Sequence, residues 1–383
     1  MEKPRAAILG AGLISGKKHI PAFLRLKHKV DLVALCDVNR EGAEKVASNF
    51  GIPHVYADLG ELLDREKPDL INICTPPRTH AKLAIQAIRR GTNVLIEKPM
   101  ALSVAECDEI ISEAQRAGVK VGVVHSDLFY DSFMKARELV NHDAIGEFRG
   151  MRIFLSTPTD YMTSRPDHWA HKLPGGVFGE SGPHVVYMTL AFINPVIDVA
   201  VRGKKVLDYP WSQYEDYRIE VIGEKATSSI VLAYTSNQWM ATVDILGSKG
   251  ALFLDLQSQS IVKYNRASLS PLGIGLSQLG SGCKQVWATC ANSVRYATGR
   301  IRSTHELLID GFVESIIANQ PPPVSAEEGR EAVRVMNRIV EELGVAANKQ
   351  IPRWSGGPPP TVEGYVGTTG TEPNLMRQMS TSR

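Results

Sequence analysis

The feature that most restricts the fold is the alternation of strands and helices in the first 124 residues. Short apolar segments alternate with stretches of helical periodicity, and the connections between them are short. Residues 70–74 are almost continuously apolar, as expected of a parallel strand covered by helices on both faces. We therefore predict a doubly wound parallel sheet, the Rossmann fold. The strands are expected at residues 5–9, 30–36, 69–74, 93–96 and 120–124, and the helices near Gly12, Asn39, Thr79 and Ser103.

The pattern changes after about residue 124. Closely spaced alternating segments predict a C-terminal α+β domain with an open, largely antiparallel sheet that has helices on one face. Its strands are expected at residues 150–155, 217–222, 227–234, 240–246, 250–255 and 260–264, and its helices at 132–141, from about Gly182, at 304–318 and at 326–346.

These patterns divide the chain into residues 1–124, residues 125–355 and a tail of residues 356–383. The tail is rich in Gly, Pro, Thr and Ser and has little to bury, so we expect it to be disordered. Residues 268–302 form an insertion that contains four glycines and then a helical segment from 283 to 300. A lid, an oligomer contact and a plain excursion remain open for it.

Charge and cysteine content exclude several partner classes. The net charge is +2, from 43 basic and 41 acidic residues, which gives no electrostatic reason to expect a nucleic acid or an anionic membrane. The five cysteines include no Cys-x-x-Cys pair, so we expect neither a disulfide framework nor a metal site, and we expect a reducing cytoplasm. We expect no signal peptide, because the first strand begins within a few residues of Met1. Residues 185–201 are apolar but interrupted by Asn194, Pro195 and Asp198, so we expect a core helix and its exit there and not a membrane span.

A glycine-rich turn follows the first strand and begins at Gly10 and Gly12. Glycine allows the backbone to turn sharply and to approach a pyrophosphate, while the following helix start, with Leu13 and Ile14, supplies free N–H groups. A purely structural glycine turn is the alternative. Asp37 at the end of the second strand favours the dinucleotide, because a carboxylate there accepts hydrogen bonds from ribose hydroxyls; it can also cap the next helix.

The expected cofactor is NAD, since a carboxylate at Asp37 repels a 2′-phosphate, although nearby Arg40 keeps NADP open. Thr75, Pro76 and His80 follow the third predicted strand, and the prolines there fix an extended turn over the nucleotide. A plain strand-to-helix connection is the alternative. Glu97 and Lys98 end a later strand of the same sheet, and the carboxyl ends of such strands border the ligand crevice.

Together these motifs resemble the glucose–fructose oxidoreductase, inositol dehydrogenase and MocA superfamily. The resemblance rests on Gly10-x-Gly12-x-x-Ser15-x-x-x-His19, Asp37, Thr75-Pro76 with His80, Glu97-Lys98-Pro99, and Gly175-Gly176 followed by Glu180-Ser181-Gly182-Pro183-His184. It implies a Rossmann domain, a C-terminal α/β domain whose open sheet mediates homodimer or homotetramer contacts, and a substrate site between them. It also implies that Lys98 is the catalytic lysine, that Glu97 and Lys98 lie beside the nicotinamide, and that His184 acts in proton transfer.

Two residues depart from the family pattern. Relatives commonly have an aspartate four residues before the histidine, where this chain has Glu180, and many have an arginine where it has Leu128. One extra methylene shifts the carboxylate of Glu180 by about a bond length, which is enough to change substrate fit or the orientation of His184. Both departures weaken the transfer of any relative's substrate to this chain.

The chemistry expected at this site is oxidation of a secondary alcohol. His184 is assigned the base and Lys98 the electrostatic and proton-relay role, with the reverse left open. Glu180 lies four residues before His184, and on a helix the two share one face, so the carboxylate orients the imidazole or binds a hydroxyl. The residues expected to contact a sugar, with loop or core packing as the alternative, are His125, Tyr161, His168 and Trp169.

Three functions fit these residues. The leading one is an NAD(P)-dependent oxidoreductase acting on a sugar, a sugar derivative or a cyclitol. A hydrolase or lyase that retains NAD and uses transient oxidation is the second, and net NADH formation distinguishes it from the first. A non-catalytic sugar or nucleotide sensor is the third, and it is disfavoured because both Lys98 and His184 are present.

Overall fold

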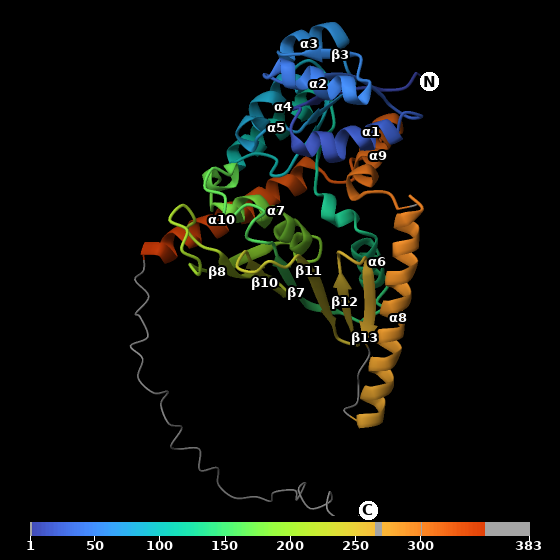
Figure 1. Ribbon diagram of the computed structural model, residues 1–383, viewed down its shortest axis with the longest axis vertical. Helices are drawn as coiled ribbons and strands as arrows, with labels where there is room; N and C mark the ends of the chain where they lie inside the picture. Colours follow the sequence, from blue (N-terminus) through green and yellow to red (C-terminus); the bar gives the residue numbers. More distant parts are fainter. Residues whose placement is uncertain (1, 265–269, 300, 349–383) are drawn as a thin grey trace, which may run out of the picture. The chain divides into compact units, whose positions relative to one another are not determined.

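The computed structural model describes residues 2–264, 270–299 and 301–348. Residues 1 to 348 cluster into one compact unit that contains two β-sheets (Figure 1). The predicted tail at 356–383 and parts of the predicted insertion lie outside the described residues. No helix in the described part of the chain combines the length and the apolar character that crossing a membrane requires.

The N-terminal sheet confirms the predicted doubly wound fold. Six strands lie in the order β3-β2-β1-β4-β5-β6, and every neighbouring pair is parallel. The strands are β1 Arg5–Leu9, β2 Asp31–Cys36, β3 His54–Tyr56, β4 Leu70–Ile73, β5 Asn93–Ile96 and β6 Val121–Val123. The helices between them are α1 Ile20–Arg25, α2 Arg40–Phe50, α3 Leu59–Glu66, α4 His80–Ile88 and α5 Val104–Ala117, with a π-helical turn at Ser15–His19 before α1.

Local sequence signals explain the ends of α5. The Ser103 side chain accepts a hydrogen bond from Glu106 N, and the Glu106 carboxylate accepts one from Ser103 N, which forms a capping box. The helix ends at Gly118, whose φ of 67° lies in the left-handed region that glycine adopts without a Cβ penalty. Capping of this kind stabilises a helix by about 1 kcal/mol at each end.

The sequence analysis missed β3 and α3. β3 contains three residues at the edge of the sheet, which is too short to show a period, and α3 has eight residues. Pairing with β2 and packing against the sheet, rather than intrinsic propensity, stabilise both elements.

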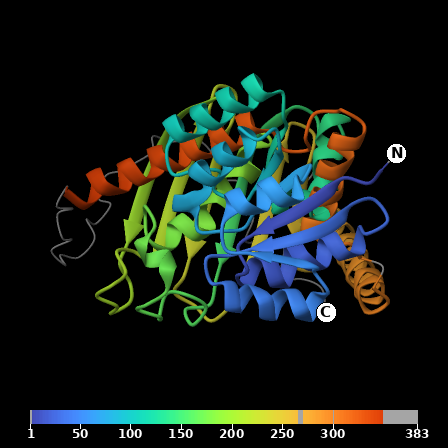
Figure 2. The same ribbon diagram turned by 90° about the horizontal axis from the view of Figure 1, so that it is seen from above.

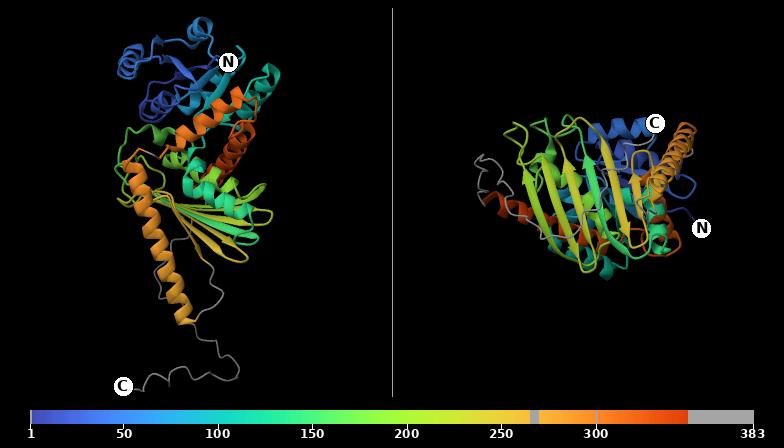
Figure 3. Two further views of the ribbon diagram at one scale, coloured as in Figure 1. Left: turned by 90° about the vertical axis from the view of Figure 1, so that its right-hand side faces the viewer. Right: turned by 90° about the horizontal axis from the view of Figure 1, so that it is seen from below.

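The second sheet has seven strands in the order β13-β12-β11-β7-β10-β9-β8. All neighbouring pairs are antiparallel except β7 with β10, which confirms the predicted, largely antiparallel sheet. Figure 3 shows one face of this sheet turned towards the viewer, without a helix of the described residues across it. The strands are β7 Phe148–Ser156, β8 Val196–Lys204, β9 Asp216–Gly223, β10 Thr227–Ala233, β11 Met240–Gly247, β12 Ala251–Asp255 and β13 Ser260–Tyr264.

Three predictions about the second half were wrong. The sequence analysis interpreted the apolar stretch after residue 185 as a helix and its exit and missed β8, whose residues alternate only irregularly between buried and exposed. Helix α7 spans Val177–Leu190 and not a segment from Gly182, so Pro183 lies inside it. Burial of almost the whole helix overrides the proline, and a Cβ at Gly182 would lie 2.7 Å from the Phe178 ring. Helix α8 begins twelve residues earlier than predicted, at Pro271.

Two late helices connect the sheets. α9 spans Thr304–Ile317 and packs near α1, whereas α10 spans Ala326–Asn348 and packs against β8 and α7 on one side and α5 and β6 on the other (Figure 2). A Cβ added at Gly122 in β6 would lie 2.7 Å from the Phe312 ring. The C-terminal helices therefore complete the cover of the N-terminal sheet. α6 spans Asp131–Asn141, after a short 3-10 turn at Ser126–Phe129.

Candidate active site

The glycine turn lies where β1, β2 and β4 end. Gly10 has a φ of 96°, and a Cβ there would lie 2.8 Å from the Cys74 carbonyl oxygen, so the fold itself requires glycine at this position. Gly12 differs, because a Cβ at that residue would meet nothing within 4 Å. Open space over Gly12, next to the start of a helix with free N–H groups, fits the close approach of a pyrophosphate.

Asp37 anchors this turn. One carboxylate oxygen accepts a hydrogen bond from Ala11 N at 2.7 Å, and the other accepts one from Asn39 N at 2.8 Å. The side chain that caps α2 is Asn39, which accepts from Gly42 N. Each carboxylate oxygen of Asp37 keeps a further lone pair for a ribose hydroxyl.

The surroundings of Asp37 also fit a dinucleotide. Leu13 and Val38 are exposed by 71% and 93%, and Ile14 is partly exposed, which leaves apolar surface beside the turn that a nucleotide can cover. Arg40, the residue that kept NADP open, forms an ion pair with Glu44 at 2.9 Å. These features fit the predicted cofactor site.

Thr75, Pro76 and His80 form the next loop along the sheet edge. The His80 ring is fully buried, with one ring nitrogen 2.9 Å from the Pro99 carbonyl oxygen and the other 2.8 Å from that of Thr75. Burial lowers the pKa of His80. The ring therefore links the loop after β4 to the loop after β5, and its imidazole does not line the surface that a cofactor can reach.

Lys98 follows β5, and its side chain is only 11% exposed. Its ammonium lies 3.0 Å from Glu180 Oε1 and also donates to the Glu180 carbonyl oxygen at 3.0 Å. Burial lowers the pKa of Lys98, but the carboxylates of Glu180 and Glu97 raise it more, so that it stands above the ordinary lysine value. Lys98 is therefore a fixed positive charge at neutral pH.

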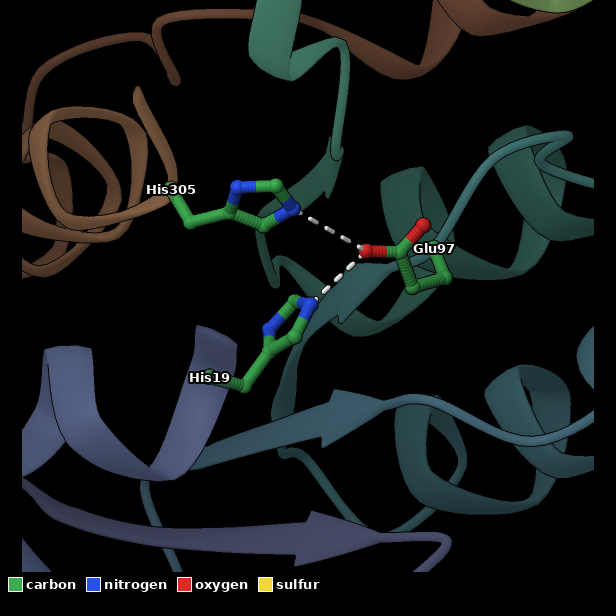
Figure 4. A group of neighbouring side chains, drawn as sticks. All are labelled: His19, Glu97 and His305. Carbon is green, nitrogen blue, oxygen red and sulfur yellow. Dashed lines mark hydrogen bonds and ion pairs between the residues drawn. The ribbon is translucent and has the colours of Figure 1, made fainter. Parts of the chain in front are cut away.

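Glu97 is buried beside Lys98 and forms an ion pair with His19 (Figure 4). His19 Nε2 lies 2.7 Å from Glu97 Oε1, and Nδ1 lies 2.7 Å from Asn72 Oδ1. The Asn72 amide nitrogen donates to the Leu95 carbonyl oxygen, so its oxygen faces the ring. Both ring nitrogens of His19 thus face acceptors, and because one of these is the carboxylate of Glu97, the doubly protonated imidazolium is favoured.

The pKa shifts agree with this assignment. Burial lowers the pKa of His19, but the Cys74 and Glu97 side chains raise it well above the usual range. Burial raises the pKa of Glu97, but the hydrogen bond and charge of His19 lower it to about 2. The second Glu97 oxygen accepts a hydrogen bond from Lys98 N at 3.0 Å, so the ion pair also fixes the backbone that positions Lys98.

His305 from α9 completes this cluster, with Nε2 3.9 Å from Glu97 Oε1 (Figure 4). Among the described residues, these three side chains form a group whose ligand atoms could hold a metal ion. The sequence analysis named no metal ligands. The group is accounted for as an ion pair beside a neutral histidine, because burial and the charge of His19 lower the pKa of His305 to about 4.

His184 pairs with a residue that the sequence analysis did not name. Its Nδ1 lies 2.9 Å from Asp127 Oδ2 and 2.7 Å from the Tyr187 hydroxyl. Burial raises the pKa of Asp127, but the charge and hydrogen bond of His184 lower it below the ordinary value. Nδ1 therefore carries a proton directed at a carboxylate, and Nε2 is the basic nitrogen.

Glu180 occupies a different place from the one expected for an orienting group. It shares the helix with His184, as predicted, but the carboxylate beside the imidazole is Asp127, and Glu180 pairs with Lys98. One helix, α7, thus brings an acid to the lysine and a base to the aspartate. The sequence signal for Asp127 was its position two residues after His125 at the end of β6, where ligand-binding residues of such sheets gather.

The four predicted substrate residues lie in different surroundings. His125 is buried and stacks on Tyr187 with ring centroids 4.3 Å apart, and burial and the charge of His184 lower its pKa to about 3. Trp169 is 45% exposed and stacks on His168. Burial lowers the pKa of His168 by more than the charge of Glu180 raises it. Tyr161 is also exposed and packs edge-on against Trp239.

A dinucleotide-type sheet edge beside a lysine, a histidine and two carboxylates defines the class of nicotinamide-dependent oxidoreductases. Residues 4–125 match the oxidoreductase family with an NAD-binding Rossmann fold, and residues 133–252 match the GFO/IDH/MocA C-terminal domain. The chain belongs to the GFO/IDH/MocA oxidoreductase family.

Curated relatives have varied substrates. The chain is 23% identical over 364 residues to myo-inositol 2-dehydrogenase of Thermotoga maritima, covering 91% of this chain and 96% of the relative. It is 29% identical over 143 residues to D-glucoside 3-dehydrogenase of Escherichia coli, covering 37% and 40%.

Solved structures show the same fold. The WlbA dehydrogenase of Bordetella pertussis, crystallised with NADH and UDP-GlcNAcA, superposes with a TM-score of 0.74 at 21% identity, covering 90% of this chain and 96% of the other. An oxidoreductase domain protein of Kribbella flavida gives a TM-score of 0.76 at 20% identity, covering 90% and 98%.

Proposed function

We propose that this protein is an NAD-dependent dehydrogenase that oxidises a secondary alcohol of a sugar, a sugar derivative or a cyclitol, or reduces the corresponding ketone. The observation that carries the proposal is a pair of contacts made by helix α7 beside the edge of the Rossmann sheet. Glu180 of this helix pairs with Lys98, and His184 of the same helix pairs with Asp127. The names of the inositol, glucoside and nucleotide-sugar relatives support the substrate class.

Gly10, Gly12, Asp37 and the loop at Thr75 would hold the dinucleotide, with its nicotinamide near Lys98. When bound, NAD supplies the acceptor for a hydride from carbon. The chain supplies the proton chemistry. His184 Nε2 takes the hydroxyl proton of the substrate, and the Asp127 carboxylate stabilises the imidazolium that results.

Lys98 acts as the electrostatic group in this proposal. Its raised pKa keeps it an ammonium, which disfavours it as the base and suits it to stabilise the alkoxide that develops as the proton leaves. Glu180 sets the charge and position of Lys98, and one of its carboxylate oxygens can also accept a hydrogen bond from a substrate hydroxyl. His168 and Trp169 are the proposed sugar contacts.

Oligomerisation and domain division belong to the same proposal. We infer a Rossmann domain at residues 1–124, a substrate domain from residue 125, and a homodimer or homotetramer in which the uncovered sheet face takes part. That face carries Phe253, which is 39% exposed, and Leu246, which is 49% exposed. Light scattering on the purified chain measures the oligomeric state.

The direct test is to release and identify any nucleotide bound to the purified protein and then to screen sugars and cyclitols for NADH fluorescence. Net NADH formation supports the dehydrogenase, whereas substrate cleavage without net NADH favours the NAD-retaining hydrolase or lyase. Asp37→Ala is expected to weaken NAD binding at least about tenfold, because ribose hydrogen bonds are lost. Affinity unchanged within about twofold would remove Asp37 from the site.

A further inference from the structure

The longest helix, α8, has an inverted distribution of side chains. It spans Pro271–Ala297 and packs against the edge strand β13. A surface helix normally turns its large apolar residues towards its own protein. Among the described side chains of α8, those that are at least partly shielded are Ile274, Ser277, Ser281, Ala288, Thr289, Ala291 and Asn292, and of these only Ser281 is buried.

The large apolar side chains lie on the opposite face. Those of Leu, Val and Trp on this helix are 62 to 77% exposed, and both cysteines are exposed as well. We call the central row of this face the α8 seam. It consists of Leu272, Leu276, Leu279, Cys283, Val286 and Cys290.

The spacing of the seam identifies the kind of partner. Its residues are separated alternately by four and three positions, which is the a and d pattern of a coiled coil. A period of 3.5 favours another helix as the partner, because it keeps one row of side chains facing a second helical axis. A flat sheet or a loop does not require it.

Glycines on both sides of the seam are an independent sign of close approach. Gly275, Gly280 and Gly282 occupy the positions that flank it, and a Cβ at any of the three would meet nothing within 4 Å. Glycine inside a helix is destabilising, and the contacts of this chain do not require it at these positions. Removing side chains beside a seam allows a partner helix to pack closely.

The seam contains no charged side chain, so two copies of it do not repel each other. Between Pro271 and Ala297 the chain has no acidic residue and two basic ones, Lys284 and Arg295, and neither is in the seam. Arg295 pairs with Asp131, 3.3 Å away. Two copies of the seam therefore meet without like charges, and no flanking charges are present to select a different partner helix.

Size and surroundings also suit a second copy. A helix of 27 residues is about 40 Å long, so a second copy of the helix lying along it would contact it over many turns. β13 lies between α8 and β12, and Phe253 on β12 contacts Tyr264 on β13, so an exposed apolar side chain also lies on the uncovered sheet face near α8. Helices that bind membrane surfaces need a basic polar face, whereas α8 has two basic residues, of which Arg295 pairs with Asp131.

We propose that α8 is a self-association helix whose seam pairs with the same seam of a second copy of this chain as a two-helix coiled coil. The test compares the full-length wild type with Leu279→Glu and with Gln285→Glu by sedimentation over a concentration series. Gln285 is exposed on the same helix but outside the seam, so the control adds the same charge.

Wild type and Gln285→Glu are expected to associate equally, whereas Leu279→Glu loses one association step, with a dissociation constant at least about 100-fold weaker. A Leu279→Glu protein with the wild-type mass at every concentration overturns the proposal, as does a wild type that stays monomeric. Equal circular dichroism and equal NAD affinity in all three proteins show that the fold is intact.

Cysteine cross-linking tests the seam without changing it. Oxidation by copper phenanthroline in air joins two thiols that face each other across the seam, so a parallel pair of wild-type helices is expected to form a covalent dimer and the Cys283→Ser, Cys290→Ser double variant is not. If each single variant still cross-links, the helices are parallel, because Cys283 then faces Cys283 and Cys290 faces Cys290. A wild type that forms no more covalent dimer than the double variant, together with a Leu279→Glu protein that associates as the wild type does, overturns the proposal. So does a monomeric wild type that sediments with phosphatidylserine vesicles when Leu279→Glu does not.

Discussion

Replacement of Asp127 by asparagine isolates the interaction on which the assignment of His184 as the base depends. The carboxylate lies 2.9 Å from His184 Nδ1, and the amide keeps the size of the side chain while removing its charge. Hydrogen bonds to charged groups contribute about 1.5–3 kcal/mol, compared with about 1 kcal/mol for neutral ones. The difference, about 0.5 to 2 kcal/mol, is lost in the variant when the imidazolium forms, because the anion stabilises the charged ring more than the neutral ring.

This difference corresponds to a fall in kcat of roughly 2- to 30-fold. The fall is larger if the amide turns its NH₂ group to the ring, since the proton then sits on Nε2 and the base is blocked. The assay is initial NADH formation with the best sugar or cyclitol of the panel, together with NAD affinity by fluorescence titration.

The expected result is a loss in kcat with NAD affinity unchanged. Asp64→Asn is the matched control, because Asp64 pairs with Arg90 at the surface, far from the site in sequence and 67% exposed. Turnover of Asp127→Asn equal to that of Asp64→Asn would refute the role of Asp127, and a change confined to NAD affinity would place Asp127 in the cofactor site.

Three further predictions follow from the same cluster. Lys98→Ala is expected to lower turnover by roughly 10² while NAD affinity stays within an order of magnitude, and near-normal turnover removes Lys98 from the mechanism. Glu180→Gln removes the anion that raises the pKa of Lys98, so the pKa of Lys98 falls and the variant loses activity at a lower alkaline pH than the wild type. Glu180→Asp keeps the anion and is expected to retain activity, and identical pH profiles for the two variants contradict this prediction. Glu97 has a lowered pKa and His19 a raised one, so their ion pair stabilises the fold fully between about pH 4.5 and 6.5. The stabilisation is lost as pH falls towards 2, because Glu97 is protonated, and as pH rises through the folded pKa of His19, because the imidazolium loses its charge. The Tm difference between wild type and His19→Gln is therefore largest in that window, and a difference independent of pH refutes the ion pair.

The parts of the fold that could be predicted from the sequence are those with local signals. The capping box at Ser103 places the start of α5, and the bounds of β5 at Asn93–Ile96 were predicted to the residue. β8 and the first half of α8 were missed because their residues do not bury with a regular period, and pairing and packing with distant segments stabilise them.

The candidate site shows the same limit. The motifs indicated Lys98 and His184, but their carboxylate partners could not be assigned, because Asp127 and His184 are brought together only when α7 packs against the turn after β6. Asn72 did offer a signal, as an amide inside an otherwise apolar strand, and it is the residue that turns its oxygen to His19. His305 is more than 200 residues from Glu97 in the sequence, so no local pattern could predict that the two side chains lie together.

The cover of β6 by the C-terminal helices has a consequence for synthesis of the protein on the ribosome. Gly122 packs under Phe312, and a Cβ at Gly329 would lie 2.5 Å from a Val123 methyl, so the residues that shield this strand are made about 200 positions after it. At typical rates of translation the delay is about 10 to 40 s. During that time the nascent Rossmann segment has all its strands but an uncovered apolar face on the last one. A chain truncated near residue 124 is therefore expected to aggregate or to bind chaperones, and it becomes a stable native sheet only when the distal helices are supplied.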